Sequence, residues 1–353
     1  MRANGILVTG AAGFIGANFV HYWLRERPGR PLLAYDALTY AGNRANLAEA
    51  ERNPDFTFVR GDIRDQALLE SLLRDRALDC IVHFAAETHV DRSISGPSAF
   101  VETNVVGTHN LLKAARSVWL ERDRPHRFHQ VSTDEVYGSL AGSAPGFHEQ
   151  QQYQPNSPYA ASKAAADHLV RAYHQTWGLQ VTTSNCSNNY GPWQFPEKFI
   201  PLCLTNILRG EPLPIYGDGG NIRDWLHVED HCRGIGLVLE QGRVGETYNI
   251  GARQEWTNIE LVKLLCDRLS ARFKASPELR RRFPEAPPAA GRSARELITH
   301  VSDRAGHDRR YAIDAGKISR ELGYSPRRSF SDGIEATMDW YLANEDWWRP
   351  LLA

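Results

Sequence analysis

The chain has 353 residues, 42% of them hydrophobic, and its 41 Lys and Arg nearly balance 42 Asp and Glu, for a formal net charge of −1 at pH 7. This length is typical of about two domains, and the near-zero charge argues against nucleic acid as the main partner. No run is apolar enough for a membrane span, and the first predicted strand begins within a few residues of Met1, so we expect a cytoplasmic protein without a membrane partner. The five cysteines lack the paired spacing of a metal site, which predicts reduced thiols and no bound metal.

The first predicted element is a strand over residues 5–9, followed by three glycines and an amphipathic stretch through residue 24. Gly10, Gly13 and Gly16 would form a turn without side chains, which lets a pyrophosphate approach the amino end of the next helix. A turn that binds no ligand is the alternative interpretation of the glycines alone.

A second predicted strand, residues 32–36, ends in Asp36. A carboxylate in this place can hold the hydroxyls of an adenosine ribose and would repel a 2′-phosphate. The pattern therefore favours NAD over NADP as the cofactor.

Strands and helices alternate through the rest of the first half of the chain. The further predicted strands are residues 56–60, 80–84, 128–131 and 179–184, and the predicted helices are residues 66–76, 98–120 and 159–177. This alternation predicts an α/β protein with a parallel, doubly wound sheet and helices on both faces.

Two adjacent carboxylates follow the predicted strand 128–131, within the run Ser-Thr-Asp-Glu-Val-Tyr-Gly over 132–138. Asp134 and Glu135 would therefore lie at the carboxyl end of a strand, where ligands bind in open α/β sheets. On its own, an Asp-Glu pair is more often part of a solvated turn.

A helix start follows, because Ser157 and Pro158 are residue types favoured at the N-cap and the first helical position. Tyr159 and Lys163 would then lie one turn apart on the same face, where the ammonium can lower the pKa of the phenol. Oxidation of a carbinol needs one base, and the tyrosine can be that base. The carboxylate pair supplies a second general acid and a second general base, which suggests a second reaction such as loss of water beside the new carbonyl.

Together with later motifs, these features make the chain resemble the extended short-chain dehydrogenase/reductases, and within them the 4,6-dehydratases of dTDP-glucose. The motifs are the glycine turn, the Tyr159/Lys163 pair and residues 36–43, 83–93, 132–138, 185–191, 195–198, 214–216, 222–225 and 306–311. The resemblance covers nearly the whole length. One departure is Ala305, where the family pattern leads us to expect proline.

The resemblance implies a Rossmann-like NAD-binding domain over residues 1–185 and a smaller α/β lobe for a nucleotide sugar over 186–353. Segments near 224–250 are expected to return to the larger domain. It also implies a homodimer in which the helices 98–120 and 159–177 pair the subunits.

Two segments of the second half are harder to place. The Arg-, Pro- and Ala-rich stretch 271–300 is expected to be a surface insertion or mobile loop with little chance of packing a core. The aromatic pairs at 340–341 and 347–348 are expected to pack the tail of the chain rather than to bind a ligand.

Position by position, the resemblance assigns roles to individual residues. The implied reaction centre comprises Thr133, Asp134, Glu135, Tyr159 and Lys163. The implied cofactor-binding residues are Gly10, Gly13, Phe14, Ile15, Gly16, Asp36, Leu38, Thr39, Asp62, Ile63, Ala85, Ala86, Tyr159, Lys163 and Asn189. The implied substrate-binding residues are Thr88, Thr133, Asn188, Lys198, Pro214, Tyr216, Arg223, Asn258, Arg304 and His307. The residue types agree, since a Tyr ring can stack on a pyrimidine and Arg side chains can pair with a diphosphate.

The implied reaction is redox-neutral and uses these residues in sequence. Tyr159 takes the C4 hydroxyl proton while Thr133 hydrogen-bonds the substrate, and the C4 hydride passes to NAD⁺. Glu135 then removes the acidified C5 hydrogen while a protonated Asp134 donates to the departing C6 hydroxyl. The hydride returns to C6 and leaves a 4-keto-6-deoxy sugar. A shared, partly desolvated site can push the pKa values of the two carboxyls apart as this requires.

Three alternatives stay open. A nucleotide-sugar 4-epimerase shares the fold, the cofactor and the Tyr159/Lys163 pair, but it has no need of two carboxylates at the sugar. A 4,6-dehydratase acting on GDP-mannose or CDP-glucose would use the same chemistry. A non-catalytic NAD-sensing protein would commonly lack the tyrosine or the lysine, and this chain has both.

Overall fold

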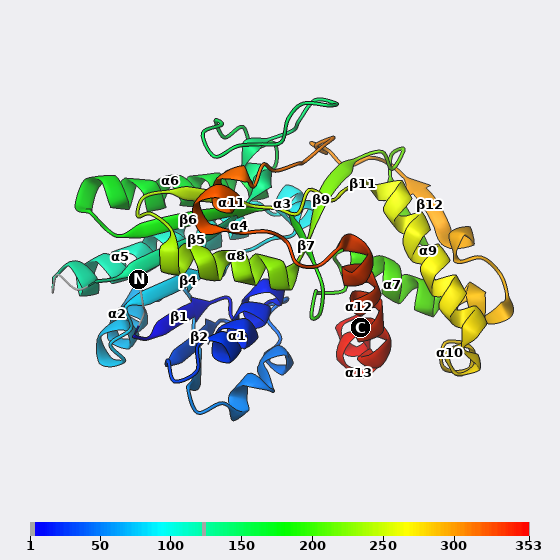
Figure 1. Cartoon of the computed structure of the whole chain (residues 1–353), viewed down its shortest axis with the longest axis horizontal. Helices are drawn as coiled ribbons and strands as arrows, with labels where there is room; N and C mark the ends of the chain where they lie inside the picture. The colour runs from blue at the N-terminus through cyan, green and yellow to red at the C-terminus, as the bar shows by residue number, and fades with distance from the viewer. Residues whose placement is uncertain (1–3, 122–124, 353) are drawn as a thin grey trace.

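The computed structural model describes residues 4–121 and 125–352, so the outermost residues of the two predicted domains lie outside the described residues. A larger lobe is built on a seven-stranded sheet in the order β10-β6-β5-β4-β1-β2-β3, and every neighbouring pair of strands is parallel (Figure 1). The strands are β1 (Ile6–Thr9), β2 (Leu32–Asp36), β3 (Phe56–Arg60), β4 (Cys80–His83), β5 (Arg127–Thr133), β6 (Val181–Cys186) and β10 (Thr247–Ile250). The strand order reverses between β1 and β4, which opens a crevice at the carboxyl ends of these strands. The prediction of a doubly wound, Rossmann-like α/β sheet is confirmed.

Helices cover both faces of this sheet. They are α1 (Phe14–Glu26), α2 (Gln66–Asp75), α3 (Val90–Ser95), α4 (Ser98–Phe100), α5 (Thr108–Leu120), α6 (Pro158–Trp177), α8 (Val228–Gln241) and α11 (Gly316–Leu322), with short 3-10 turns η1 (Arg44–Leu47), η2 (Ala50–Arg52) and η4 (Asp134–Tyr137). Successive side chains of a strand point to opposite faces. Ile6 and Val8 therefore pack in the layer under α1 and α8, whereas Leu7 packs in the layer under α2, α5 and α6.

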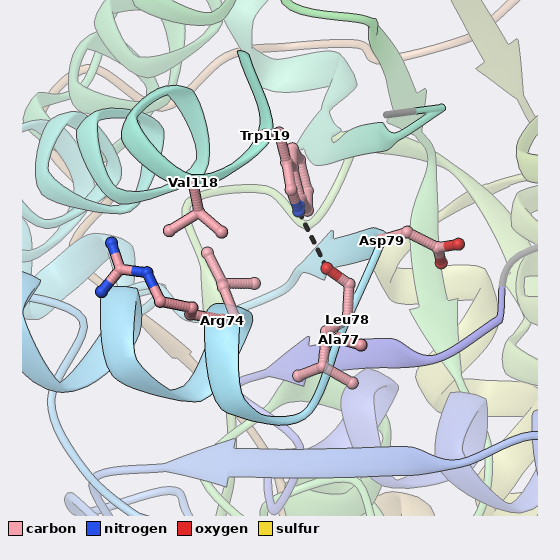
Figure 2. A pocket seen from close by; sticks show the side chains of 7 residues that line it. Arg74, Ala77, Leu78, Asp79, Val118 and Trp119 are labelled. Carbon is pink, nitrogen blue, oxygen red and sulfur yellow. Dashed lines mark hydrogen bonds between the residues drawn. The ribbon is translucent and has the colours of Figure 1, made fainter. Parts of the chain in front are cut away.

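The layer under α2 and α5 is closed at the end remote from the crevice. The indole Nε1 of Trp119 on α5 donates a 2.8 Å hydrogen bond to the carbonyl of Leu78, just before β4 (Figure 2). The cavity beside this contact measures only about 20 Å³, which is the space of a single water. This end of the lobe is therefore packing, not a ligand site.

The predicted helix 98–120 is interrupted. After α4, residues Val101–Gly107 form a π-helical segment, η3, before α5 begins. The wider turn directs Asn104 inward, where it accepts a hydrogen bond from the Glu87 amide at 2.8 Å and donates to Ser162 Oγ at 2.8 Å. Apolar periodicity does not reveal such a segment, because the residues on either side keep their ordinary helical pattern.

The smaller lobe contains two further sheets. One has the order β11-β9-β7, with β7 and β9 parallel and β9 and β11 antiparallel, and the other pairs β8 with β12 in parallel. Its strands are β7 (Asn188–Tyr190), β8 (Leu213–Tyr216), β9 (Ile222–His227), β11 (Glu255–Thr257) and β12 (Ile298–Val301). Its helices are α7 (Phe199–Arg209), α9 (Asn258–Ala275), α10 (Pro277–Arg282), α12 (Phe330–Ala343) and α13 (Glu345–Trp348), with 3-10 turns η5 (Pro287–Ala290), η6 (Ala294–Leu297) and η7 (Arg349–Leu352).

The chain crosses between the lobes more than once. After β9, in the small three-stranded sheet, α8 packs against α1 and β10 adds to the edge of the large sheet beside β6. At the far end of the chain, the Trp347 indole donates to Asn46 Oδ1 at 2.7 Å, and Asn46 Nδ2 donates to the Ala12 carbonyl at 2.9 Å. The tail thus packs, as expected, and is linked to the glycine turn through Asn46.

The expectation that residues 271–300 have little chance of packing a core is wrong. Phe273, Phe283 and Ala294 are at most 2% exposed and belong to the hydrophobic core of the smaller lobe. Phe283 follows α10 directly and Ala294 lies in the short turn η6, and Arg280 donates to the carbonyls of Phe273 and Lys274 at the end of α9. Composition hides this packing because the arginines between the apolar residues point outward.

In the described part of the chain, no helix is both long enough and apolar enough to cross a membrane. All five cysteines are buried and free.

Candidate active site

A cavity of about 470 Å³ lies in the crevice at the carboxyl ends of the large sheet and reaches the first residues of the smaller lobe. The sequence-predicted residues that line it are Gly10, Gly13, Phe14, Ile15, Gly16, Asp36, Thr39, Asp62, Ile63, Ala85, Ala86, Thr88, Thr133, Glu135, Tyr159, Lys163, Asn188, Asn189 and Lys198. Those that do not line it are Leu38, Asp134, Pro214, Tyr216, Arg223, Asn258, Arg304 and His307. The structure therefore brings together nearly all the predicted cofactor residues, but only part of the predicted substrate residues.

The glycine turn after β1 leaves space at the amino end of α1. Gly10 has φ +65°, and a Cβ there would lie 2.6 Å from the Ala85 amide nitrogen, while a Cβ on Gly16 would lie 2.1 Å from the Gly10 carbonyl oxygen. No side chain caps α1 and its first turn has no acidic residue. The first amides of α1 therefore suit the pyrophosphate of NAD.

Asp36 ends β2 with its carboxylate fixed at the cavity wall. Its Oδ2 accepts from the Ala12 amide at 2.9 Å and its Oδ1 from the Leu38 amide at 2.7 Å. A Cβ on Gly42 would lie 2.7 Å from Oδ1, so only glycine leaves this space open. Leu38 itself adopts φ 55°, is partly buried against the core and does not line the cavity, so its expected contact with the cofactor stays a prediction.

The end of β5 separates the two carboxylates. Thr133 Oγ1 accepts from the Glu135 amide at 3.3 Å and begins the turn η4, so that Glu135 points into the cavity while Asp134 turns behind the wall. Asp134 is 1% exposed, and its Oδ2 is buried without a hydrogen-bond partner among the described residues.

The surroundings of the two carboxyls differ. Burial raises the pKa of Asp134 well above its ordinary value, and Glu135 and Asp224 raise it further. Burial also raises the pKa of Glu135, but Arg223, Arg304 and Lys198 oppose the rise. Asp134 is therefore suited to hold a proton, and Glu135 faces three cations that favour its ionised form.

Tyr159 and Lys163 lie one turn apart near the start of α6, where Ser157 Oγ accepts from the Ala160 amide at 3.1 Å as the N-cap. Burial raises the pKa of Tyr159, Glu135 raises it further, and a hydrogen bond with Thr133 opposes the rise. The expected lowering by the lysine therefore does not outweigh burial.

Four predicted substrate residues contact one another, or nearby backbone, beside the cavity. Tyr216 Oη donates to Asp91 Oδ2 at 3.4 Å, its ring meets the edge of His307 at a centroid distance of 5.9 Å, and Arg304 Nη1 lies 3.6 Å from Asp91 Oδ1. Arg223 is buried over the Tyr311 ring at 4.3 Å. Arg304 Nε is buried without a partner in the described residues, which fits an acceptor that arrives with a ligand.

Two further predicted substrate residues, Pro214 and Asn258, are placed by backbone elements of the smaller lobe. Pro214 lies in β8, and Asn258 is the first residue of α9, with its amide bonded to the Asn221 carbonyl at 2.9 Å. Neither residue lines the cavity.

Sequence reasoning missed several residues of the cavity wall, among them Tyr40, Glu87, Cys186, Ser187 and Phe195. Each lies inside a sequence motif named above, so the motifs could have predicted these residues, but roles were assigned only to their neighbours. The buried Ser187 Oγ and Asn188 Oδ1 have no hydrogen-bond partner among the described residues, which leaves both atoms available to a ligand.

Comparisons with known proteins agree on one family. The sequence model of the family described as GDP-mannose 4,6 dehydratase matches residues 7–337. The dTDP-glucose 4,6-dehydratase of Xanthomonas campestris pv. campestris (strain B100) is 53% identical over 350 residues, which cover 98% of this chain and 95% of that protein.

Solved structures agree in fold. DesIV, a dTDP-glucose 4,6-dehydratase from Streptomyces venezuelae crystallised with NAD bound, superposes with a TM-score of 0.88 and 50% identity, covering 98% of this chain and 99% of that one. The UDP-glucose 4-epimerase of Thermus thermophilus in complex with NAD has a TM-score of 0.81 and 26% identity, covering 96% and 99%. Over the residues that the structure describes, no group of three or more His, Cys, Asp and Glu could hold a metal ion.

Proposed function

The chain belongs to the GDP-mannose 4,6-dehydratase family of the extended short-chain dehydrogenase/reductases, and we propose that it is the NAD-dependent dehydratase that converts dTDP-glucose to dTDP-4-keto-6-deoxyglucose. The family resemblance of the sequence motifs is thereby confirmed. The substrate follows from the relatives, since a dTDP-glucose 4,6-dehydratase shares 53% of its residues with this chain over nearly the full length of both. The observation that carries the chemistry is the pair Asp134 and Glu135 beside Tyr159.

The cofactor site is formed by the larger lobe. The amino end of α1 would hold the pyrophosphate, Asp36 would accept from the ribose hydroxyls, and Tyr159 and Lys163 line the same cavity. NAD bound there would supply the reversible hydride acceptor that the oxidation at C4 and the later reduction at C6 both need.

The chain's own residues move the protons. Tyr159 Oη takes the proton of the C4 hydroxyl as a phenolate, a form that its hydrogen bond with Thr133 favours, and Thr133 orients the substrate hydroxyl. The resulting ketone acidifies the C5 hydrogen, which Glu135 removes from its place in the cavity wall. We assign proton donation to the departing C6 hydroxyl to Asp134, which burial and two neighbouring carboxylates keep protonated. Its side chain lies behind the cavity wall, so it must turn toward the substrate to donate. Water is released, and C5 is reprotonated as C6 is reduced.

The nucleotide is held at the boundary of the lobes. Lys198 lines the cavity and bonds Thr88 through Nζ at 3.2 Å to the carbonyl and 3.3 Å to Oγ1. Arg223 and Arg304 place positive charge close enough to oppose the raised pKa of Glu135, so they suit the diphosphate. Tyr216 is 36% exposed and offers its ring to the thymine.

A 4-epimerase is the main alternative function. The epimerase of Thermus thermophilus shares the fold at only 26% identity. An epimerase has no need of a protonated carboxyl and a carboxylate at the sugar. Here burial and two neighbouring carboxylates favour the protonated form of Asp134, whereas Arg223, Arg304 and Lys198 favour the ionised form of Glu135.

We further propose a homodimer that works in the cytoplasm. Val101, Val106 and Trp177 are 51%, 45% and 41% exposed on the segments expected to pair subunits, and exposed large apolar side chains on those segments favour an interface. The five buried, free thiols suit a reducing compartment. Light scattering of the purified protein and of Val106→Glu tests the dimer, because a charge at the interface should shift the mass towards the monomer.

A panel of nucleotide sugars tests the function. Purified protein is incubated with dTDP-glucose, UDP-glucose, GDP-mannose or CDP-glucose, and the molecular masses of the products are measured by mass spectrometry. We expect loss of one water from dTDP-glucose, with no net accumulation of NADH, and no product with Tyr159→Phe. An isomer of unchanged mass would show an epimerase, and water loss only from another nucleotide sugar would correct the substrate.

A further inference from the structure

A buried carboxylate one helical turn beyond Lys163 has no part in the chemistry described so far. Asp167 follows Lys163 by four residues on α6, so Tyr159, Lys163 and Asp167 form one row along the helix, which packs against β5. Asp167 is 6% exposed and does not line the cavity. A buried carboxylate is costly unless its charge is compensated, so its surroundings are informative.

Three side chains donate hydrogen bonds to Asp167. Ser132 Oγ donates to Oδ2 at 2.5 Å, Gln130 Nε2 donates to Oδ1 at 3.2 Å, and the Tyr153 hydroxyl also donates. Burial raises the pKa of Asp167, while Lys163 and then the donors Ser132 and Gln130 oppose the rise. Several donors around one buried carboxyl favour its ionised form.

Lys163 contacts the same strand between these donors. Its Nζ donates to the Val131 carbonyl at 2.8 Å, and its side chain lines the cavity. Burial lowers the pKa of Lys163, and Asp167 is the first group that raises it again. The two helix residues thus hold residues 130–132 of β5, which lead directly into the reaction centre 133–135.

The other titratable groups around this pair do not replace the carboxylate. The Cys186 thiol on β6 and the His83 imidazole on β4 face Lys163, and burial keeps both uncharged at neutral pH by raising the thiol pKa and lowering the imidazole pKa to about 3. Asp167 itself faces Tyr137, Tyr153 and, on its own helix, His168.

We propose that Asp167 is a positioning residue that keeps Lys163 protonated in the buried site and aligns its ammonium with the cavity. The proposal deepens the proposed function and rests on it in one respect, namely that Lys163 binds the cofactor as an ammonium. The carboxylate acts through the lysine and does not touch the substrate.

Asp167→Asn isolates the charge. The amide oxygen can still accept from Gln130, and the amide nitrogen can donate to the Ser132 hydroxyl, so these two hydrogen bonds are kept while the charge is lost. Gln130→Met is the matched control, because it removes one hydrogen bond from the same carboxylate and keeps the charge.

The lysine can be titrated directly. The lysines of the chain are Lys113, Lys163, Lys198, Lys263, Lys274 and Lys317. With lysine isotope-labelled at Cε, the NMR signal that Lys163→Arg removes belongs to Lys163. We expect Asp167→Asn to lower the midpoint of this signal by at least about one pH unit, as for loss of a nearby opposite charge, and Gln130→Met to leave it near that of the wild type. No substrate is needed, so the result does not depend on whether dTDP-glucose is the substrate.

The affinity for NAD gives a second measurement. As the pH rises, the affinity for NAD should begin to fall at a lower pH in Asp167→Asn than in the wild type, because a lysine with a lower pKa loses its proton at a lower pH. An unchanged Lys163 midpoint in Asp167→Asn would overturn the proposal, even if the variant were less stable. If Asp167→Asn does not fold, the wild type decides, because a Lys163 that is already neutral at pH 7 would equally overturn it.

Discussion

The cofactor half and the nucleotide half of the site are built in different ways. In the cofactor half, strands β1, β2, β4 and β5 end side by side, and the residues just beyond them line one continuous cavity. In the nucleotide half, Tyr216, Arg304 and His307 come from loops and a short strand of the smaller lobe. Tyr216 and Arg304 both contact Asp91 of α3, and the His307 ring meets the ring of Tyr216. The first half is complete in the chain as folded. The second is held together by contacts between side chains, which a nucleotide sugar would replace under the proposed function.

The difference indicates which half of the site is rigid before the ligand binds and which half can rearrange when it binds. Backbone groups of parallel strand ends cannot rearrange without breaking the sheet, so the reaction centre is preorganised. Side chains that bond one another across the two lobes can exchange partners at small cost, since exposed or long ion pairs contribute only about 0.2–1 kcal/mol. Substitutions in the first half should therefore change rate or cofactor choice, and those in the second should change substrate affinity.

The largest expected effect is in the reaction centre. Glu135→Gln should keep NAD binding and some C4 oxidation, because Tyr159 and Lys163 are untouched, but water loss should fall by about 10²- to 10⁴-fold, or roughly 3–5 kcal/mol of barrier. In D₂O the wild-type product should carry deuterium at C5, and the variant should return substrate without C5 exchange. Near-normal dehydration by Glu135→Gln would show that another residue is the base.

A substitution in the cofactor half should also change the preference between NAD⁺ and NADP⁺. Asp36→Ala removes a carboxylate that would repel a 2′-phosphate, so the preference for NAD⁺ over NADP⁺ should fall by about ten- to a hundredfold, the usual range for charged hydrogen bonds. Titrating both cofactors into the apoprotein measures this. Equal affinity of the wild type for both would contradict the assigned role of Asp36.

In the nucleotide half, Arg304→Gln should raise KM for dTDP-glucose by about tenfold while leaving NAD affinity unchanged, because the guanidinium suits the diphosphate. Arg309→Gln is the matched control, since Arg309 pairs on the surface with Asp218 in the same part of the lobe. A similar effect of both substitutions would mean that the loss is general rather than specific to Arg304.

The two halves should nonetheless be coupled through charge. Glu135 must be ionised to act as a base, so activity should fall as the pH drops through its raised pKa, and it should fall again as the pH rises through the raised pKa of Asp134, which must be protonated. Arg304 opposes the rise at Glu135, so Arg304→Gln should move the acidic limb of the kcat profile to higher pH by less than about one unit. If the acidic limb does not move, the charge of Arg304 does not influence the pKa of Glu135.

The smallest effect is expected at the contact between the lobes. Asp91→Asn removes the carboxylate that pairs with Arg304 and accepts from Tyr216, so dTDP should bind up to about fivefold more tightly, the value of a partly exposed ion pair. Calorimetry with dTDP measures it. Weaker binding would show that Asp91 orders these side chains instead of competing with the ligand.

Local patterns in the sequence predicted the frame of the site well. Alternating apolar runs placed β2 at Leu32–Asp36 and β3 at Phe56–Arg60, and the Ser157-Pro158 start placed Tyr159 and Lys163 on one face of α6. These features depend on residues close in sequence, so propensity, capping and periodicity are enough to predict them.

Contacts between distant segments had to come from the tertiary structure. Asp134 and Glu135 are neighbours in sequence, yet the turn that Thr133 begins sends one behind the wall and the other into the cavity, which alone separates their surroundings. The π-helical turn at Asn104, the packing of Phe283 and the contact of Asp91 with Tyr216 likewise depend on partners far along the chain. The sequence by itself determined which chemical groups the site contains and on which elements they stand. Burial, and with it the protonation state and partner of each group, was decided only when those elements packed, because desolvation and electrostatic interaction depend on distance in space.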